Sequence, residues 1–446
     1  KMTGGIDGVY YDDDENYDID IFLGATGDFV RVVGDRSDER NDYDSLKSYF
    51  ESGGSKGSAA VALKNGRIYL SGGYSFDYEE TMDRTMIFNM GRISSDEVKS
   101  LPVPLMDHAA ALLDDGSESG IVVVAFGSND SGNSNSILAY DPDSNSYRTL
   151  GLKDNLTGAK AISIDGDVYI IGGCNGKTGS KKVYKVSKTT LQVEDFSTLN
   201  TGRCFHTIAD VSTTDNAGAV IPRILVIGGS TDQDGKTPVL DKFAEIVTVS
   251  KSTEVAISDR VGGDSAELLT RGLIAAAATT IRFDDLEQIQ KAVPVVGGYF
   301  QDGEAENLSL VTNPSLFVFS ETGQNKWTYD VNGAPNRCAR PSMAAIGTTE
   351  KSAAQYAAVN CGSSEISRDS DADQIIFVVQ VKRSYSSDLE QNIFSASVKE
   401  SLMDENKDID SGSMIVDGPI TANTLGQAFA FGSLFVYQVS GYSIPF

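Results

Sequence analysis

The feature that most constrains the fold is a repeated pair of apolar segments. In each copy a short polar turn joins the two segments, and glycine follows the second one. The clear copies are Ser58–Lys64 with Arg67–Gly73, His108–Leu113 with Ile121–Gly127, Ala159–Ile164 with Asp167–Gly173, and His206–Ser212 with Arg223–Gly229, and the looser ones are Gly272–Ile281 with Ala292–Gly298, Pro341–Gly347 with Gln355–Gly362, and Gln427–Phe431 with Leu434–Gly441. Internal repetition of this kind predicts an architecture built from one stacked unit.

The third copy shows what each unit contains. The Asp165–Gly166 turn accepts positive φ at both central positions, so it closes a two-residue hairpin. The Gly172–Gly173 pair lets a neighbouring backbone approach where a Cβ would clash. A third strand, Val183–Val186, and a weaker fourth, Gln192–Phe196, follow. Each unit is therefore predicted to be a sheet of four antiparallel strands.

Units of four antiparallel strands, repeated radially, bury their faces against one another and leave only short edges. The sequence thus predicts an all-β protein, a β-propeller of seven blades, with six blades as the alternative. Residues 425–446 supply only a first and second strand, and residues 1–35 supply what resembles a third and fourth, Asp18–Leu23 and Phe29–Val33. We therefore expect residues 1–446 to form a single domain whose two ends share the seventh blade and close the ring.

This pattern resembles the kelch family of propellers over essentially the whole chain. The resemblance is carried by double glycines after an apolar strand, as in Val168–Gly173, and by the hairpin from Tyr140-Asp141-Pro142 to Tyr147. Arg203 also matches the arginine that precedes the first strand in this family. Three blades lack the second aromatic residue and one has a single glycine, so the resemblance is to a divergent member.

Charge and hydropathy exclude two classes of partner. The chain has 63 acidic and 37 basic side chains and a formal net charge of −26. Such a surface does not neutralise phosphate backbones, so no nucleic-acid partner is expected. No apolar run approaches the roughly 20 residues that a membrane-spanning helix needs, and we expect no membrane span.

The four cysteines bear on the cellular compartment. Cys338 and Cys361 lie at adjacent ends of one predicted hairpin, and Cys174 and Cys204 could bridge neighbouring blades. Four buried reduced thiols are the alternative. Three glycosylation sequons fall in predicted loops, at Asn129, Asn155 and Asn307. Together these features favour a secreted, extracellular or lumenal glycoprotein, with a cytoplasmic protein as the alternative.

Candidate metal ligands occur in one acidic loop. Asp404, Asn406 and Asp408 have the alternate spacing that offers oxygen ligands to Ca²⁺, but the loop lacks the glycine and glutamate of a complete calcium loop. A solvated acidic loop is the alternative reading. No other cofactor is expected.

No catalytic constellation is predicted. The two histidines, His108 and His206, occupy the same position in two repeats, which indicates a structural role. Inserted segments at Asp42–Glu51, Ser265–Arg271 and Asp284–Lys291 resemble short helices that could enlarge a partner surface. The alternative is that these segments only cover the ends of strands.

We therefore expect a non-catalytic scaffold that binds proteins or glycans at its loop-built faces, as a component of an extracellular or lumenal assembly. One alternative is a carbohydrate-active enzyme using acidic residues near the propeller channel. A second alternative is an intracellular kelch adaptor.

Overall fold

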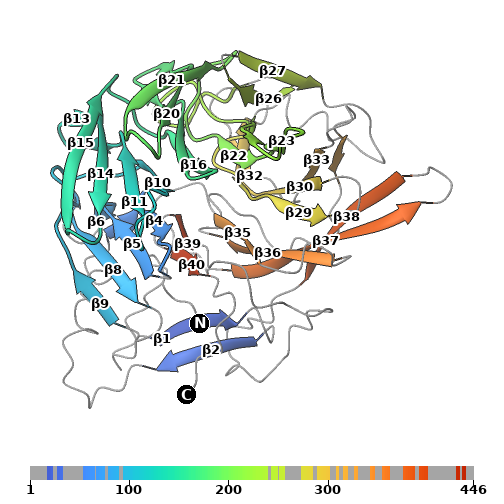
Figure 1. Cartoon of the computed structure of the whole chain (residues 1–446), viewed down its shortest axis with the longest axis horizontal. Helices are drawn as coiled ribbons and strands as arrows, with labels where there is room; N and C mark the ends of the chain where they lie inside the picture. Colours follow the sequence, from blue (N-terminus) through green and yellow to red (C-terminus); the bar gives the residue numbers. More distant parts are fainter. Residues whose placement is uncertain are drawn as a thin grey trace.

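A computed structural model gives the arrangement of the strands around a ring (Figure 1). It describes residues 18–23, 28–33, 54–65, 67–75, 79–89, 94–239, 243–249, 251–256, 273–284, 289–301, 308–310, 315–319, 326–329, 342–346, 354–361, 375–386, 391–399, 428–431 and 434–437. Within these residues all regular structure is β-strand, and none of them forms a helix that is long and apolar enough to cross a membrane.

Among the described residues, six antiparallel sheets of four or five strands form blades, which we number in chain order; five of these sheets have four strands and one has five. Blade 1 contains β4 (Ala59–Ala62), β5 (Arg67–Ser71), β8 (Thr85–Asn89) and β9 (Ser94–Glu97); blade 2, β10 (Ala109–Leu113), β11 (Ile121–Ala125), β14 (Ser136–Asp141) and β15 (Ser146–Leu152); blade 3, β16 (Lys160–Ile164), β17 (Asp167–Ile171), β20 (Lys182–Val186) and β21 (Val193–Thr198); blade 4, β22 (Thr207–Asp210), β25 (Ile224–Ile227), β26 (Phe243–Thr248) and β27 (Lys251–Ala256); blade 5, β28 (Ala277–Ala278), β29 (Ile281–Asp284), β30 (Ile289–Val296), β33 (Ser315–Phe319) and β34 (Lys326–Tyr329); and blade 6, β35 (Ser342–Ile346), β36 (Ala354–Cys361), β37 (Ile375–Ser386) and β38 (Gln391–Lys399).

Shorter strands extend the loops of the blades or lie near the chain ends. They are β3 (Gly54–Lys56) with β6 (Tyr74–Ser75) and β7 (Glu80–Thr81), β12 (Ser128–Asn129) with β13 (Gly132–Asn133), β18 (Cys174–Asn175) with β19 (Thr178–Gly179), β23 (Thr213–Thr214) with β24 (Val220–Ile221), β31 (Tyr299–Gln301) with β32 (Leu308–Leu310), β1 (Asp18–Leu23) with β2 (Asp28–Val33), and β39 (Ala428–Phe431) with β40 (Leu434–Tyr437).

The hydrophobic core lies between the blades, and the sheets of blades 2 to 5 pack against a neighbouring blade on both faces. Strand β11 is buried at every position. Its alternate residues point to opposite faces: Val123 packs with Ile170 of blade 3, whereas Val122 packs with Tyr69 of blade 1. A continuous apolar run in a second strand is therefore the pattern of a sheet that is sandwiched between two neighbours.

A chain of backbone hydrogen bonds joins the segments that precede successive first strands. Asp107 donates its N–H to the carbonyl oxygen of Gly57 (2.8 Å), Gly158 to Asp107 (3.0 Å), Phe205 to Gly158 (2.8 Å) and Ala275 to Phe205 (2.8 Å). All five residues have a φ between 50° and 72°, in the left-handed region. Non-glycine residues pay about 1 kcal/mol or more for this conformation, so the bonds from blade to blade hold them in it.

The all-β propeller architecture and the hairpin turns predicted from the sequence are confirmed. Asp165 and Gly166 both have positive φ, at 50° and 81°, as a two-residue turn requires. Strands β39 and β40 lie beside β4, β35 and β36. They form a two-stranded sheet separate from β1–β2. The count of seven blades, with a seventh shared by residues 1–35 and 425–446, stays a prediction, as does the alternative of six.

One of the expected helical insertions is wrong. Asp284 ends β29 and Ile289 begins β30, and the two residues are partners in the antiparallel register, so the described residues of Asp284–Lys291 belong to paired strands. Ile281 and Phe283 of β29 are buried between blades 5 and 6, which fits the alternation of a strand. The segments Asp42–Glu51 and Ser265–Arg271 lie outside the described residues.

Candidate interaction face

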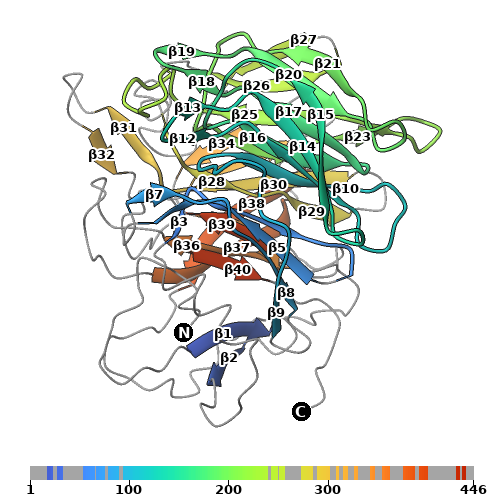
Figure 2. The ribbon, with the colours of Figure 1, turned by 90° about the vertical axis from the view of Figure 1, so that its left-hand side faces the viewer.

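One face of the ring carries hairpins that continue the second and third strands of successive blades. These are β12–β13 of blade 2, β18–β19 of blade 3, the loop Ser230–Val239 of blade 4 and β31–β32 of blade 5, and we call them together the hairpin face. The labelled strands of this face, β12, β13, β18, β19, β31 and β32, lie on the left of Figure 2, whereas β23, from the loop between the first and second strands of blade 4, lies on the right. Loops on a rigid propeller are where binding residues gather.

A disulfide joins two blades on this face. Cys174 begins the β18–β19 hairpin, and Cys204 lies in the segment that leads into blade 4. Their Cα atoms are 5.4 Å apart, and both cysteines are fully buried. This pair was predicted from the sequence. Cys338, and the side chain of Cys361, lie outside what the structure describes, so their pairing stays a prediction.

Side-chain amides link three of the hairpins. The Nδ2 group of Asn133 in β13 donates to Oε1 of Gln233 (2.9 Å) and to the carbonyl oxygen of Cys174 (3.2 Å). Gln233 also accepts a bond from the N–H of Gly176 (2.9 Å) and donates its own N–H to the carbonyl oxygen of Gly176 (2.8 Å). These hydrogen bonds thus connect blades 2, 3 and 4 at the hairpin face. Sequence reasoning missed this link, because nothing in the spacing of Asn133 and Gln233 indicates that they meet.

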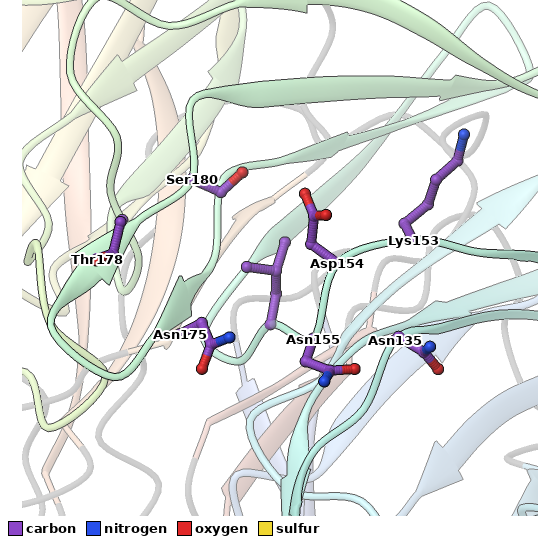
Figure 3. Close-up of a pocket in the computed structure, with 9 residues that line it drawn as sticks. Asn135, Lys153, Asp154, Asn155, Asn175, Thr178 and Ser180 are labelled. Atoms are coloured by element: carbon purple, nitrogen blue, oxygen red, sulfur yellow. The ribbon is translucent and has the colours of Figure 1, made fainter.

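A polar pocket opens on the hairpin face between blades 2 and 3 (Figure 3). Its volume is about 560 Å³. The lining residues are Asn135, Lys153, Asp154, Asn155, Leu156, Asn175, Thr178, Gly179 and Ser180. Oδ2 of Asp154 forms an ion pair with Nζ of Lys182 (2.9 Å). Nζ of Lys153 lies 5.1 Å from the ring centroid of Tyr184. Both charged groups of the lining therefore have a partner in blade 3.

The glycosylation sequons differ in their surroundings. Asn155 is exposed at the pocket, where a glycan could be attached. Asn129 is half-buried; its Nδ2 donates to the carbonyl oxygen of Pro104 (3.1 Å), and its Oδ1 accepts from the N–H of Ser131 (2.8 Å). Asn307 lies outside the described residues. Glycosylation of all three stays a prediction.

A buried ion pair occupies the position of the kelch-like arginine. Nη2 of Arg203 bonds to Oε1 of Glu245, and Nη1 donates to the carbonyl oxygen of Gly228 (2.8 Å). Glu245 also accepts the N–H of Asn200 (2.7 Å) and the hydroxyl of Ser252 (2.7 Å). Arg203 is completely buried and Glu245 is 1% exposed. The Glu245 carboxylate therefore has a structural role in blade 4. The sequence alone did not distinguish it from the other carboxylates.

The two histidines are buried in equivalent places, as the repeat predicted. Burial lowers the pKa of His108 to about 4 and holds the pKa of His206 well below its usual range, to which the nearby charges of Arg203 and Lys160 contribute. Nε2 of His108 lies 2.9 Å from the hydroxyl of Ser71. Both rings are neutral near pH 7 and pack against the double glycines of the preceding blade.

The calcium candidates Asp404, Asn406 and Asp408 lie outside the described residues. Among the residues that are described, no group of three or more metal-ligating side chains comes together. A similarly spaced pair, Asp141 and Asp143, belongs to the β14–β15 turn. There Oδ1 of Asp141 accepts the N–H of Asp143 (2.9 Å), so that carboxylate stabilises the turn.

Comparison with known proteins identifies one family motif, within blade 3. Residues 156–200 match the model of the kelch motif, and that range spans the four strands of blade 3. No curated protein matches the chain. Among solved structures, a structure of YjhT is similar with a TM-score of 0.48 and 11% identity, over 77% of this chain and 97% of that one. The kelch motif in blade 3, together with equivalent glycines and strands in the other blades, supports the resemblance to a divergent kelch-repeat β-propeller.

Proposed function

We propose that the chain is a non-catalytic interaction scaffold that binds protein partners through its hairpin face, within an extracellular or lumenal assembly. The observation that carries this proposal is the bracing of that face. The Cys174–Cys204 disulfide and the contacts of Asn133 and Gln233 fix hairpins from three consecutive blades relative to one another. Hairpins held in this way present a preformed surface, and a preformed surface loses little conformational entropy when a partner binds.

The disulfide supports an oxidising compartment, because such bonds persist in secreted and lumenal proteins. The net charge of −26 supports a particle that stays soluble and repels its own copies unless a complementary surface is offered. Partners with basic contact surfaces are therefore favoured by the charge.

The buried acids support binding rather than hydrolysis. Glu245 is saturated by Arg203, by two backbone N–H groups and by Ser252. Asp232 is held by the N–H of Lys236, and hydrogen bonds keep its pKa below the usual range although burial opposes this. A glycosidase general acid needs a raised pKa, whereas the pKa of Asp232 is lowered, and the Glu245 carboxylate is occupied by its ion pair with Arg203.

Native mass measurement tests the proposal. Protein isolated from its source should be recovered in a particle larger than the 47.6 kDa chain. Charge reversal at a hairpin tip, Asp234→Lys, should weaken the binding of the chain to its partner in that particle at least tenfold. The matched control is Glu118→Lys, because Glu118 lies in the loop between the first and second strands of blade 2, away from the hairpin face.

A lone monomer from native material, or equal weakening of binding in the hairpin and control variants, would contradict the proposal. Intact mass supplies a further check on the compartment. The Cys174–Cys204 bond and the predicted Cys338–Cys361 bond together make the chain lighter by four hydrogen atoms. A fully reduced chain would favour the intracellular adaptor instead.

A further inference from the structure

The pocket between blades 2 and 3 has the size and composition of a small-ligand subsite. At about 560 Å³ it lies within the range of roughly 300–1,000 Å³ that is common for such sites. Its wall combines the amides of Asn135, Asn155 and Asn175 with the hydroxyls of Thr178 and Ser180. Figure 3 labels these side chains, which come from the loops of both blades.

The three amides have no hydrogen-bond partner among the described residues. They differ in this from Asn129, which is bonded to Pro104 and Ser131. Each free amide offers two donors and one acceptor, which suits a ligand whose groups both donate and accept. Hydroxyl groups have that property, whereas phosphates and ammonium groups do not.

The charges of the pocket favour a neutral ligand. The lining contains one cation, Lys153, and one anion, Asp154. Asp154 is paired with Lys182, and Lys153 lies over the ring of Tyr184. The balanced lining leaves no excess of either sign to attract a phosphate, a sulfate or a metal ion.

The pocket is also rigid. Lys153 donates its N–H to the carbonyl oxygen of Asn135 (2.8 Å), which joins its two blade 2 segments. On the opposite wall, Asn175 follows the disulfide-bonded Cys174, and Ser180 donates its N–H to the carbonyl oxygen of Gly173 (2.7 Å). Leu156, which is 3% exposed, supplies an apolar element of the lining. Hydrogen-bonding groups held this firmly need little reorganisation when a ligand binds.

We infer that this pocket binds a neutral saccharide, with the amides of Asn135, Asn155 and Asn175 bonding its hydroxyl groups. The inference deepens the proposed function, because it adds a glycan contact to the same hairpin face. Asn155 is also the asparagine of a sequon, so an N-glycan attached there would lie at the opening of this pocket. The chain's own glycan and an external saccharide would then compete for one place.

The test uses the full chain made in a bacterial periplasm, where disulfides form and N-glycans are not added. An array of neutral, sialylated and sulfated oligosaccharides identifies the preferred class, and calorimetric titration with the strongest neutral oligosaccharide gives its affinity. Neutral oligosaccharides should be preferred. Asn135→Ala and Asn175→Ala should each weaken the affinity about tenfold, with unchanged unfolding temperature. The matched control, Asn216→Ala, removes an exposed amide from the turn between β23 and β24 and should leave the affinity unchanged.

Absence of saccharide binding, a preference for charged saccharides, or equal affinity in all three variants would overturn the inference. The same variants separate it from the proposed function. Loss of saccharide binding with native particle formation intact, in Asn135→Ala and Asn175→Ala, leaves the scaffold proposal standing. Saccharide binding by a chain that forms no particle would support the pocket and contradict the assembly.

Discussion

The hydroxyl of Ser71 lies 2.9 Å from Nε2 of His108. At the equivalent repeat position, Ile171 has no side-chain group that could bond to His206. Both imidazoles are buried at the start of a blade, and neither ring nitrogen of His206 has a hydrogen-bond partner among the described residues. The same residue type in the same repeat position therefore has two different environments.

Replacing each histidine by phenylalanine should separate these environments. His108→Phe leaves the buried Ser71 hydroxyl without its imidazole partner, and we expect it to lower the free energy of unfolding by about 1–3 kcal/mol. His206→Phe removes two unpaired nitrogens from an apolar place, and we expect a change within about 1 kcal/mol. Urea unfolding of the two variants measures both values. A larger loss for His206→Phe than for His108→Phe would show that the hydrogen bond is not what distinguishes the sites.

The free energy of unfolding should decrease as the pH is lowered from 6.5 to about 4. Burial lowers the pKa of His108 to about 4, and the pKa of His206 is lower than its usual value as well. In the unfolded chain both rings gain a proton near pH 6.5, while in the folded protein they stay neutral. The unfolded state thus binds more protons in this window, and acidification favours it, by up to about 1.4 kcal/mol per pH unit for each histidine.

Thermal unfolding measured at intervals from pH 7.5 to 4 tests this dependence. The lowered carboxyl pKa values, such as that of Asp114, act in the same direction but below about pH 4. Because His206→Phe should fold normally, it is the useful comparison. This variant should lose about half of the slope between pH 6.5 and 4.5, and an unchanged slope would assign the effect to other groups.

The disulfide should stabilise blades 3 and 4 substantially. It closes a loop with a sequence separation of 30, for which loop-closure entropy gives roughly 3–4 kcal/mol. We expect the double variant Cys174→Ala with Cys204→Ala to lose about that much in urea unfolding under oxidising conditions. Its stability should also respond less to reductant than that of the parent. A double variant as stable as the parent would mean that the hairpin contacts of Gln233 suffice to hold this junction.

The sequence predicted the fold well because its signals are local. Asp165-Gly166 specifies a turn and Gly172-Gly173 a close backbone approach, each from adjacent residues. The Cys174–Cys204 pairing also followed from repeat position, once the hairpins were aligned. The error at Asp284–Lys291 arose because a short apolar alternation can be read as a helix when its pairing partner is not considered.

The candidate site was harder to predict because it is assembled across blades. Asn135 and Asn175 come from different repeats and meet only when blades 2 and 3 pack. Their sequence surroundings are those of ordinary polar loops. Asn155 was identified as a sequon, but its place at a pocket depends on the path of the segment between β15 and β16. Residue types at a radial interface carry no spacing rule that a single sequence reveals.

Alanine substitution should lower the free energy of unfolding more at Gly172, in a double glycine, than at Gly176, in a hairpin turn. Gly172 and Gly176 both have positive φ, at 63° and 56°, so alanine at either costs about 1 kcal/mol of conformational strain. A Cβ on Gly172 would lie 2.3 Å from the carbonyl oxygen of Arg203, whereas a Cβ on Gly176 would meet nothing within 4 Å. That oxygen also accepts the N–H of Gly173 (2.8 Å), which ties blade 3 to the start of blade 4.

Gly172→Ala must therefore displace the backbone that joins two blades, and overpacking adds about 1–3 kcal/mol to the strain. We expect urea unfolding to show a loss of about 2–4 kcal/mol for Gly172→Ala and about 1 kcal/mol for the matched control Gly176→Ala. The near equality of the two φ values means that strain alone gives equal losses. Equal losses would thus contradict the close contact between blades, and a larger loss at Gly172 would locate the junction at the carbonyl oxygen of Arg203.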